Sequence, residues 1–157
     1  MFVFLARGQT ISGVMKLNDI DLLSHVYQTA EMGRDGIRSV LKYSRDAVLN
    51  KTLLRQEEEY RRLQDAAEEL IRAHGMMPEG VGAMAKLSSE MMSTVKTMAD
   101  PSATKIAEMM IQGSTMGVTK SLRTIRDCQG AEKGSVELAE RLLKTEQANI
   151  EELKAFL

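Results

Sequence analysis

The chain has 157 residues, 43% of them hydrophobic and 27% charged, with a formal net charge of −1. This length and composition predict one globular domain with a full core and exclude a largely disordered chain. The balanced charge removes the electrostatic case for a nucleic-acid partner. The single cysteine, Cys128, excludes an internal disulfide, which suits a reducing cytoplasm. Few aromatic residues and only two prolines favour an all-α protein.

The N-terminal segment stands apart because it lacks the periodicity and caps found later in the chain. Its apolar stretch, residues 2–6, is too short for the core of a signal peptide or for a membrane span. We therefore expect residues 1–17 to be an unstructured extension and residues 18–157 to form the folded domain. Starts of translation at Met1 and at Met15 are both compatible with the sequence.

The first long helix is predicted over residues 19–48, with Asn18 as its N-cap. Charged residues such as Glu31 lie on its outer face and are expected to be solvated. Apolar and small residues at helical spacing form its inner face: Leu23, Val26, Tyr27, Ala30, Gly33, Ile37, Val40, Leu41, Ser44 and Val48.

The second helix is predicted over residues 52–74, ending at Gly75 in the position that follows a helix C-cap. Glu57 flanks its inner face, whereas Glu58 and Glu59 point outward. The residues of the inner face follow three-four spacing: Leu49, Leu53, Gln56, Tyr60, Leu63, Ala67, Leu70 and His74.

A connection of about 25 residues follows, and its spacing predicts a shorter helix over residues 82–98. This connection is rich in methionine, and these side chains either pack over the core or offer an adaptable apolar surface. The methionines are Met76, Met77, Met84, Met91, Met92 and Met98.

The third long helix is predicted over residues 102–128, with Asp100 as its cap and Pro101 at its first position. It is apolar around most of its circumference, so we expect other helices to enclose it. Gly113 and Gly117, one turn apart, would allow a neighbouring helix to approach closely. The charged side chains of this helix exclude a membrane span.

The last helix is predicted from Glu132 or Val136 to Phe156. Its inner face consists of Leu138, Leu142, Glu146, Asn149, Leu153 and Phe156. Short turns make the first and the last pair of helices antiparallel, and the long connection can travel the length of the bundle. Two hairpins joined by one crossover predict a four-helix bundle.

The helix lengths, the crossover and the closing run LAERLLKTEQANIEELKAFL resemble the ferritin-like superfamily, in particular small bacterial rubrerythrin-related proteins. The resemblance covers Asn18 to Leu157 and implies a ferritin-like bundle. Members that bind two irons use Glu-x-x-His on two helices and a glutamate on each of the others. This sequence has no Glu-x-x-His: Asn149 stands third after Glu146, and His25 and His74 lie near helix ends.

The interior polar residues lead to a specific expectation. Counting inward from the helix ends places Tyr60 and Glu146 at one height in the bundle. We expect one interior cluster, where a ferritin-like metal site would lie, formed by Glu57, Tyr60, Glu146 and Asn149. Without a cation, a buried carboxylate must be hydrogen-bonded or protonated, and Tyr60 and Asn149 are natural donors. The alternative is that Glu146 leans out to water.

Two functions remain open. The first is a non-catalytic ferritin-like bundle that has lost its di-iron site, carries no cofactor, and acts as a homo-oligomer, most simply a dimer, or through a protein partner. The second is a metal-binding protein, an iron store or oxidoreductase, with an unconventional site that includes Glu57 and Glu146. Nucleophilic catalysis by Cys128 is disfavoured because the dipole at a helix C-terminus opposes a thiolate.

Overall fold

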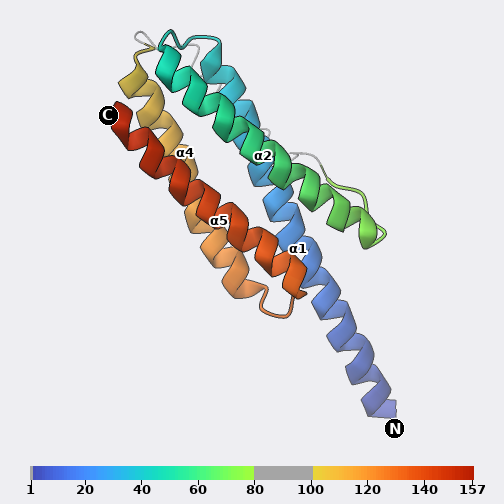
Figure 1. Ribbon diagram of the computed structural model, residues 1–157. Coiled ribbons are helices and arrows are strands. Elements are labelled where there is room, and N and C mark those ends of the chain that lie inside the picture. Colours follow the sequence, from blue (N-terminus) through green and yellow to red (C-terminus); the bar gives the residue numbers. More distant parts are fainter. Residues whose placement is uncertain (1, 80–100) are drawn as a thin grey trace.

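The computed structural model describes residues 2–79 and 101–157, with side chains from Leu17 onward. This part of the chain forms four α-helices and a final 3-10 turn, which confirms the all-α prediction for it (Figure 1). The elements are α1 (Phe2–Leu41), α2 (Ala47–Ala73), α4 (Ala103–Asp127), α5 (Lys133–Leu153) and η1 (Lys154–Phe156). The helix expected over residues 82–98 lies outside the described residues.

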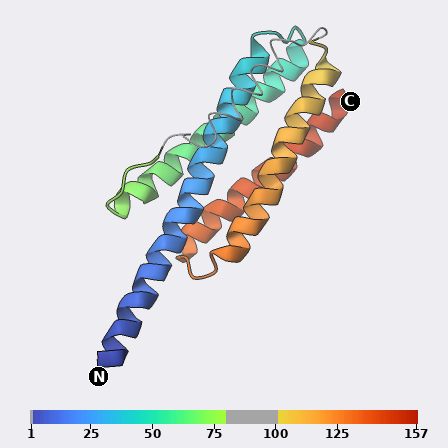
Figure 2. The ribbon, with the colours of Figure 1, turned by 180° about the vertical axis from the view of Figure 1, so that it is seen from behind.

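The contacts at the two ends of the bundle fix the directions of the helices. At one end, Asp19 of α1 lies beside His74, which follows α2, and accepts a hydrogen bond from Glu132 at the start of α5. At the other end, the Thr104 hydroxyl at the start of α4 donates to the carbonyl of Phe156 at 2.9 Å. Helices α1 and α5 therefore run one way and α2 and α4 the other (Figures 1 and 2). The most extensive contacts join α1 to α2 and α4 to α5.

The boundary between the first two helices differs from the sequence-based prediction. Helix α1 ends at Leu41 rather than at Val48, and α2 begins at Ala47. Asp46 is the N-cap of α2, and its side chain accepts from the Leu49 N–H at 2.8 Å. The apolar spacing continues across this short turn, so periodicity alone assigned Val48 to the wrong helix. Its side chain is in fact 68% exposed.

The start of the first helix also differs from the prediction. Helix α1 begins at Phe2, so the expectation of an unstructured segment over residues 1–17 is wrong for residues 2–17, and Asn18 is an interior helical residue rather than an N-cap. No proline interrupts residues 2–41, so nothing in the backbone obliges the helix to stop. In both views the N-terminal turns of α1 extend beyond the other helices (Figures 1 and 2).

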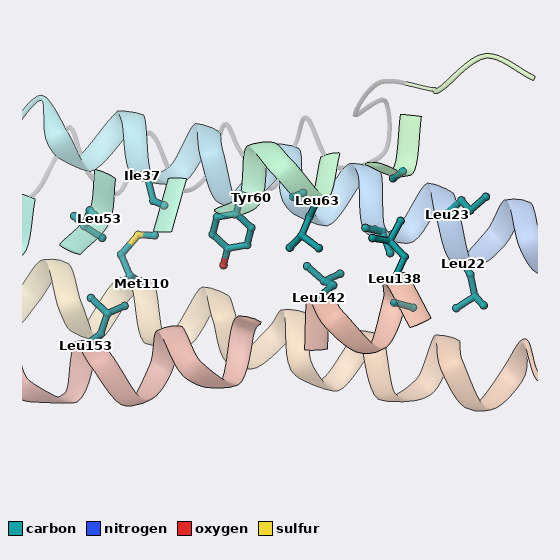
Figure 3. Close-up of a cluster of buried hydrophobic side chains, with 14 of the residues drawn as sticks. Leu22, Leu23, Ile37, Leu53, Tyr60, Leu63, Met110, Leu138, Leu142 and Leu153 are labelled. Atoms are coloured by element: carbon teal, nitrogen blue, oxygen red, sulfur yellow. The ribbon is translucent and has the colours of Figure 1, made fainter. Parts of the chain in front are cut away.

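The core is built from leucines, isoleucines and valines of all four helices (Figure 3). The inner faces predicted for α2 and α5 are largely confirmed, because their residues are buried as the three-four spacing requires. The largest fully buried side chains are Leu22, Leu23, Ile37, Leu49, Leu53, Leu63, Ile71, Ile106, Leu142, Leu153, Val26 and Val40.

Helix α4 is less enclosed than its composition predicted. Its N-cap is Ser102, which accepts from the Lys105 N–H at 3.2 Å, rather than Asp100. Met116 is 57% and Leu122 53% exposed, so the helix presents a broad face to solvent. Its buried residues form a single stripe: Ile106, Ala107, Met110, Ser114 and Ser121. No helix in the described part of the chain has the length and hydropathy needed to cross a membrane.

Candidate functional site in the bundle interior

A polar layer crosses the middle of the bundle between apolar layers. The Tyr60 hydroxyl of α2 donates a hydrogen bond to Glu146 Oε2 of α5 at 2.8 Å. Each of these two residues is only 3% exposed. Figure 3 shows the Tyr60 ring reaching between the helices, with Leu53 and Met110 on one side and Leu63 on the other. The structure therefore places Glu146 inside the bundle, not leaning out to water.

Two glycines make room for this pair. A Cβ atom at Gly33 of α1 would lie 2.7 Å from the Tyr60 ring, and one at Gly117 of α4 would lie 2.8 Å from Glu146 Oε1. Tyr60 and Glu146 thus each pack against bare backbone of another helix. The glycine of α4 that faces the layer is Gly117; Gly113, the other glycine expected to allow close approach, is half-buried one turn away.

Burial controls the protonation of the layer. The pKa of Glu146 is raised to about 7, chiefly by desolvation, although hydrogen bonds from Tyr60 and Ser114 act in the opposite direction. The pKa of Tyr60 is raised well above its ordinary value, first by burial and then by the nearby charge of Glu146. Below neutral pH, Glu146 is therefore a neutral carboxylic acid bonded to a neutral phenol.

Amide side chains extend the layer by one turn. Asn149 follows Glu146 by three residues on α5 and is 4% exposed, and its Nδ2 has no hydrogen-bond partner among the described residues. Gln56 precedes Tyr60 by four residues on α2 and is 2% exposed, with Nε2 also unpartnered. Ser114 of α4, also buried, completes the set. Helix α4 therefore presents Ser114 and Gly117 inward, whereas Met116 points outward.

Glu57 does not join the layer. Its carboxylate pairs with Arg34 at 3.4 Å and with Arg38 at 3.0 Å on the flank of the α1–α2 pair. Three residues correspond to about 300° around an α-helix, which leaves Glu57 about 60° away from the direction of Tyr60, at the edge of the inner face. Of the four residues expected in one cluster, the structure joins Tyr60 and Glu146 directly, buries Asn149 on the same face of α5, and leaves Glu57 outside.

Glu31 is less solvated than its place in the sequence predicted. The residue is half-buried, and Oε2 is shielded from water without a hydrogen-bond partner. Its pKa is raised, mainly by this desolvation and then by the charge of Asp35, against the effect of Arg34. Its place on α1 is separate from the Tyr60–Glu146 pair, which packs against Gly33.

The residues of the interior layer do not fit a di-iron centre. Such a centre needs four carboxylates and two imidazoles directed at one another. Among the described residues, Glu146 is the one carboxylate in the layer, and the other groups there are a phenol, a hydroxyl and amides. Gly33 and Gly117 stand where ligands from the other two helices would project.

His25 is a buried structural residue rather than a ligand. Its Nε2 lies 2.7 Å from the Ser121 hydroxyl, and its Nδ1 lies 3.3 Å from the Thr29 hydroxyl. Burial first, and the charge of Lys120 second, lower its pKa to about 4, so the ring is neutral at pH 7. Both ring nitrogens have polar neighbours within α1 and α4, which leaves none for a metal.

Cys128 is buried at the C-cap of α4, with 4% exposure. Its pKa is raised by desolvation and, to a smaller extent, by Asp21 and Asp127. A protonated, enclosed thiol is a poor nucleophile.

A second polar group lies at the end of the bundle, and sequence reasoning missed it. Asp19, His74 and Glu132 place one ligand-type atom each within 4.8 Å of one another. The sequence treated them separately, as residues near three different helix ends. The signal available was the topology itself: with these helix directions, the end of α2 and the start of α5 meet at the same level of α1, near Asp19.

Comparisons of the chain with protein-family models, with curated proteins and with solved structures found no match in any of the three.

Proposed function

We propose that this protein is a non-catalytic, ferritin-like helical bundle that works by self-association, as a homodimer. The observation that supports the proposal is the overhang of α1, defined here as residues 2–16. This segment is helical but extends past the other helices (Figures 1 and 2). Most helical stability in proteins comes from packing against other elements, so a helical segment that extends past the rest of the bundle calls for a surface to pack on.

The composition of the overhang favours a second copy as that surface. It begins with the apolar run Phe-Val-Phe-Leu-Ala and also contains Ile11 and Val14, with only two charged residues, Arg7 and Lys16. Leu17, where it joins the bundle, is 64% exposed. An apolar helix with little charge calls for a hydrophobic partner, and the overhang of another chain provides one of matching length and character.

The interior of the bundle supports the non-catalytic part of the proposal. The polar layer contains a side-chain hydrogen bond between Tyr60 and Glu146 rather than a set of metal ligands directed at one point. The alternative of an iron site shared by Glu57 and Glu146 loses its basis, because Glu57 pairs with Arg34 and Arg38 on the flank of the α1–α2 pair.

The test is the molar mass in solution of the full chain and of a chain that begins at Met15, measured by light scattering across a range of concentrations. We expect a dimer for the full chain and a monomer for the shortened chain. The two should have the same helical circular dichroism per folded residue and melting temperatures within a few degrees.

A matched pair of charge substitutions locates the interface. Phe4→Glu in the overhang should dissociate the dimer. Leu54→Glu on α2, at a side chain that is 54% exposed within the bundle, should leave it intact. A full chain that stays monomeric at every concentration would rule out the proposal.

A further inference from the structure

The group at the end of the bundle combines one buried and one exposed carboxylate with an imidazole. Asp19 of α1 is 2% exposed, and its Oδ1 accepts the Glu132 N–H at 2.6 Å. His74 Nε2 lies 3.6 Å from Asp19 Oδ2 and 3.6 Å from Glu132 Oε2. Three helices that are distant in sequence therefore direct one donor atom each to a common point.

The second nitrogen of His74 is already committed. Its Nδ1 lies 2.7 Å from the carbonyl of Leu70, so this nitrogen carries a proton and donates it to the backbone. In a neutral ring, the other nitrogen, Nε2, then presents its lone pair to the two carboxylates. A backbone carbonyl that holds Nδ1–H and leaves Nε2 free is the usual outer support of a metal-binding histidine.

The Glu132 carboxylate is also free to act as a metal ligand, because it does not cap its own helix. Glu132 occupies the N-cap position of α5, but its side chain makes no capping hydrogen bond. The backbone N–H of Glu132 donates to Asp19 Oδ1 of α1. The Glu132 carboxylate is thus released from its own helix and lies towards His74.

The distances fit a shared ion better than direct hydrogen bonds. A charged N–H···O bond is typically 2.7–2.9 Å long, so 3.6 Å is too long for one. Donor atoms bound tetrahedrally at ~2.1 Å to one ion lie about 3.4 Å apart, close to both observed separations. Three donors on one side of such an ion leave the fourth position for water, and the exposure of Glu132, 64% for its side chain, keeps that position accessible.

We propose that Asp19 Oδ2, His74 Nε2 and Glu132 Oε2 form a binding site for one divalent cation of the zinc class. The set of one imidazole and two carboxylates suits Zn²⁺, which accepts nitrogen and oxygen ligands at tetrahedral spacing. The ion neutralises the two carboxylates that face each other across this group. It also joins α1, the end of α2 and the start of α5. The site is independent of the overhang and of the polar layer.

The full chain is first stripped of metal with a chelator and dialysed. The test is then a calorimetric titration of this protein with Zn²⁺ alone. We expect saturation at one ion per chain. Glu132→Gln and His74→Gln should each raise the dissociation constant at least about tenfold. Replacement of the ion by Co²⁺ should give the visible absorption of a four-coordinate site, and this signal should be absent from both variants.

Two control variants keep the result specific. Glu137→Gln removes an exposed carboxylate from the first turns of the same helix, and His25→Gln removes the other histidine of the chain. Both should bind Zn²⁺ as the parent does. Adding Zn²⁺ should raise the melting temperature of the parent and of the controls but not that of Glu132→Gln. Because the Glu132 side chain is exposed, this variant should fold normally, so a missing shift would report lost binding. The absence of saturable binding, or an unchanged dissociation constant in Glu132→Gln or in His74→Gln, would overturn the proposal.

Discussion

Glu146 and His25 are buried titratable residues whose pKa shifts have opposite consequences for stability. The pKa of Glu146 rises from 4.5 to about 7 on folding, so the folded state holds a proton that the unfolded state has released. Its contribution to the unfolding free energy is present at low pH and is lost as pH rises from 4.5 through 7. The pKa of His25 falls from 6.5 to about 4, so its contribution is instead lost as pH falls through that window. Between pH 4.5 and 6.5 the two slopes largely cancel.

Glu146→Gln should expose the pH dependence that His25 gives to the unfolding free energy, because the opposing contribution of Glu146 is removed. Glutamine keeps an acceptor for the Tyr60 hydroxyl but does not titrate. The unfolding free energy of the variant should therefore increase relative to the parent between pH 5 and pH 8, by about 3 kcal/mol at most. Urea unfolding at several pH values measures this difference. His25→Gln should show the reverse behaviour, with stability falling as pH rises, and identical pH profiles for all three proteins would contradict the assignment.

The Tyr60–Glu146 hydrogen bond can be tested by a double-mutant cycle. Glu146→Leu leaves the Tyr60 hydroxyl buried without its acceptor, which should lower the unfolding free energy by about 1–3 kcal/mol. Adding Tyr60→Phe removes the orphaned hydroxyl and should restore part of this loss. Chemical unfolding of the two single variants and the double variant gives the coupling energy. Strict additivity would mean that the two side chains do not interact.

At the scale of the helices, close approach at two glycines positions the polar layer. A methyl group at Gly33 would meet three ring atoms of Tyr60 at 2.7–2.8 Å, and this ring is enclosed. A methyl group at Gly117 would meet the terminal atoms of Glu146, which belong to a more flexible side chain. Helix propensity alone would favour alanine at both sites by up to ~1 kcal/mol. The packing therefore explains why glycine occupies mid-helix positions.

Gly33→Ala should destabilise the protein by about 1–3 kcal/mol because the Tyr60 ring must move. Gly117→Ala should have a smaller effect, because the carboxylate of Glu146 can shift. Gly134→Ala is the matched control: a Cβ there meets nothing within 4 Å, so this variant should be neutral or slightly stabilised. Thermal melts of the three variants rank the effects, and a Gly33→Ala protein as stable as Gly134→Ala would mean that α1 and α2 are further apart than described.

At the scale of the whole molecule, the side chains of the interior polar layer predict how much iron the protein binds. Protein from cells grown in iron-rich medium should lack a di-iron centre, because one buried carboxylate with phenol, hydroxyl and amide neighbours is too small a ligand set. Elemental analysis and near-ultraviolet absorption of the Glu132→Gln variant measure this without a contribution from the end of the bundle. About two irons per chain in that variant would contradict the prediction.

The sequence by itself determined the helical class and most of the buried faces. Three-four spacing identified the inner residues of α2 and α5, including Glu146 and Asn149, because burial follows the helix period directly. It also placed Tyr60 and Glu146 at one height. It failed at helix boundaries: apolar periodicity does not stop at a short turn, and Asn18 has the residue type of a cap without the conformation of one.

Only the tertiary structure decided which polar residues meet. Glu57 and Tyr60 are three residues apart, yet a rotation of about 60° lets Glu57 pair with arginines of α1 on the flank of the bundle and places Tyr60 in the core. Asp19, His74 and Glu132 meet because the end of α2 and the start of α5 converge on α1 at Asp19, a relation with no signature in local spacing. Local periodicity reports which side of a helix is buried, whereas contacts between helices depend on their register, crossing and direction.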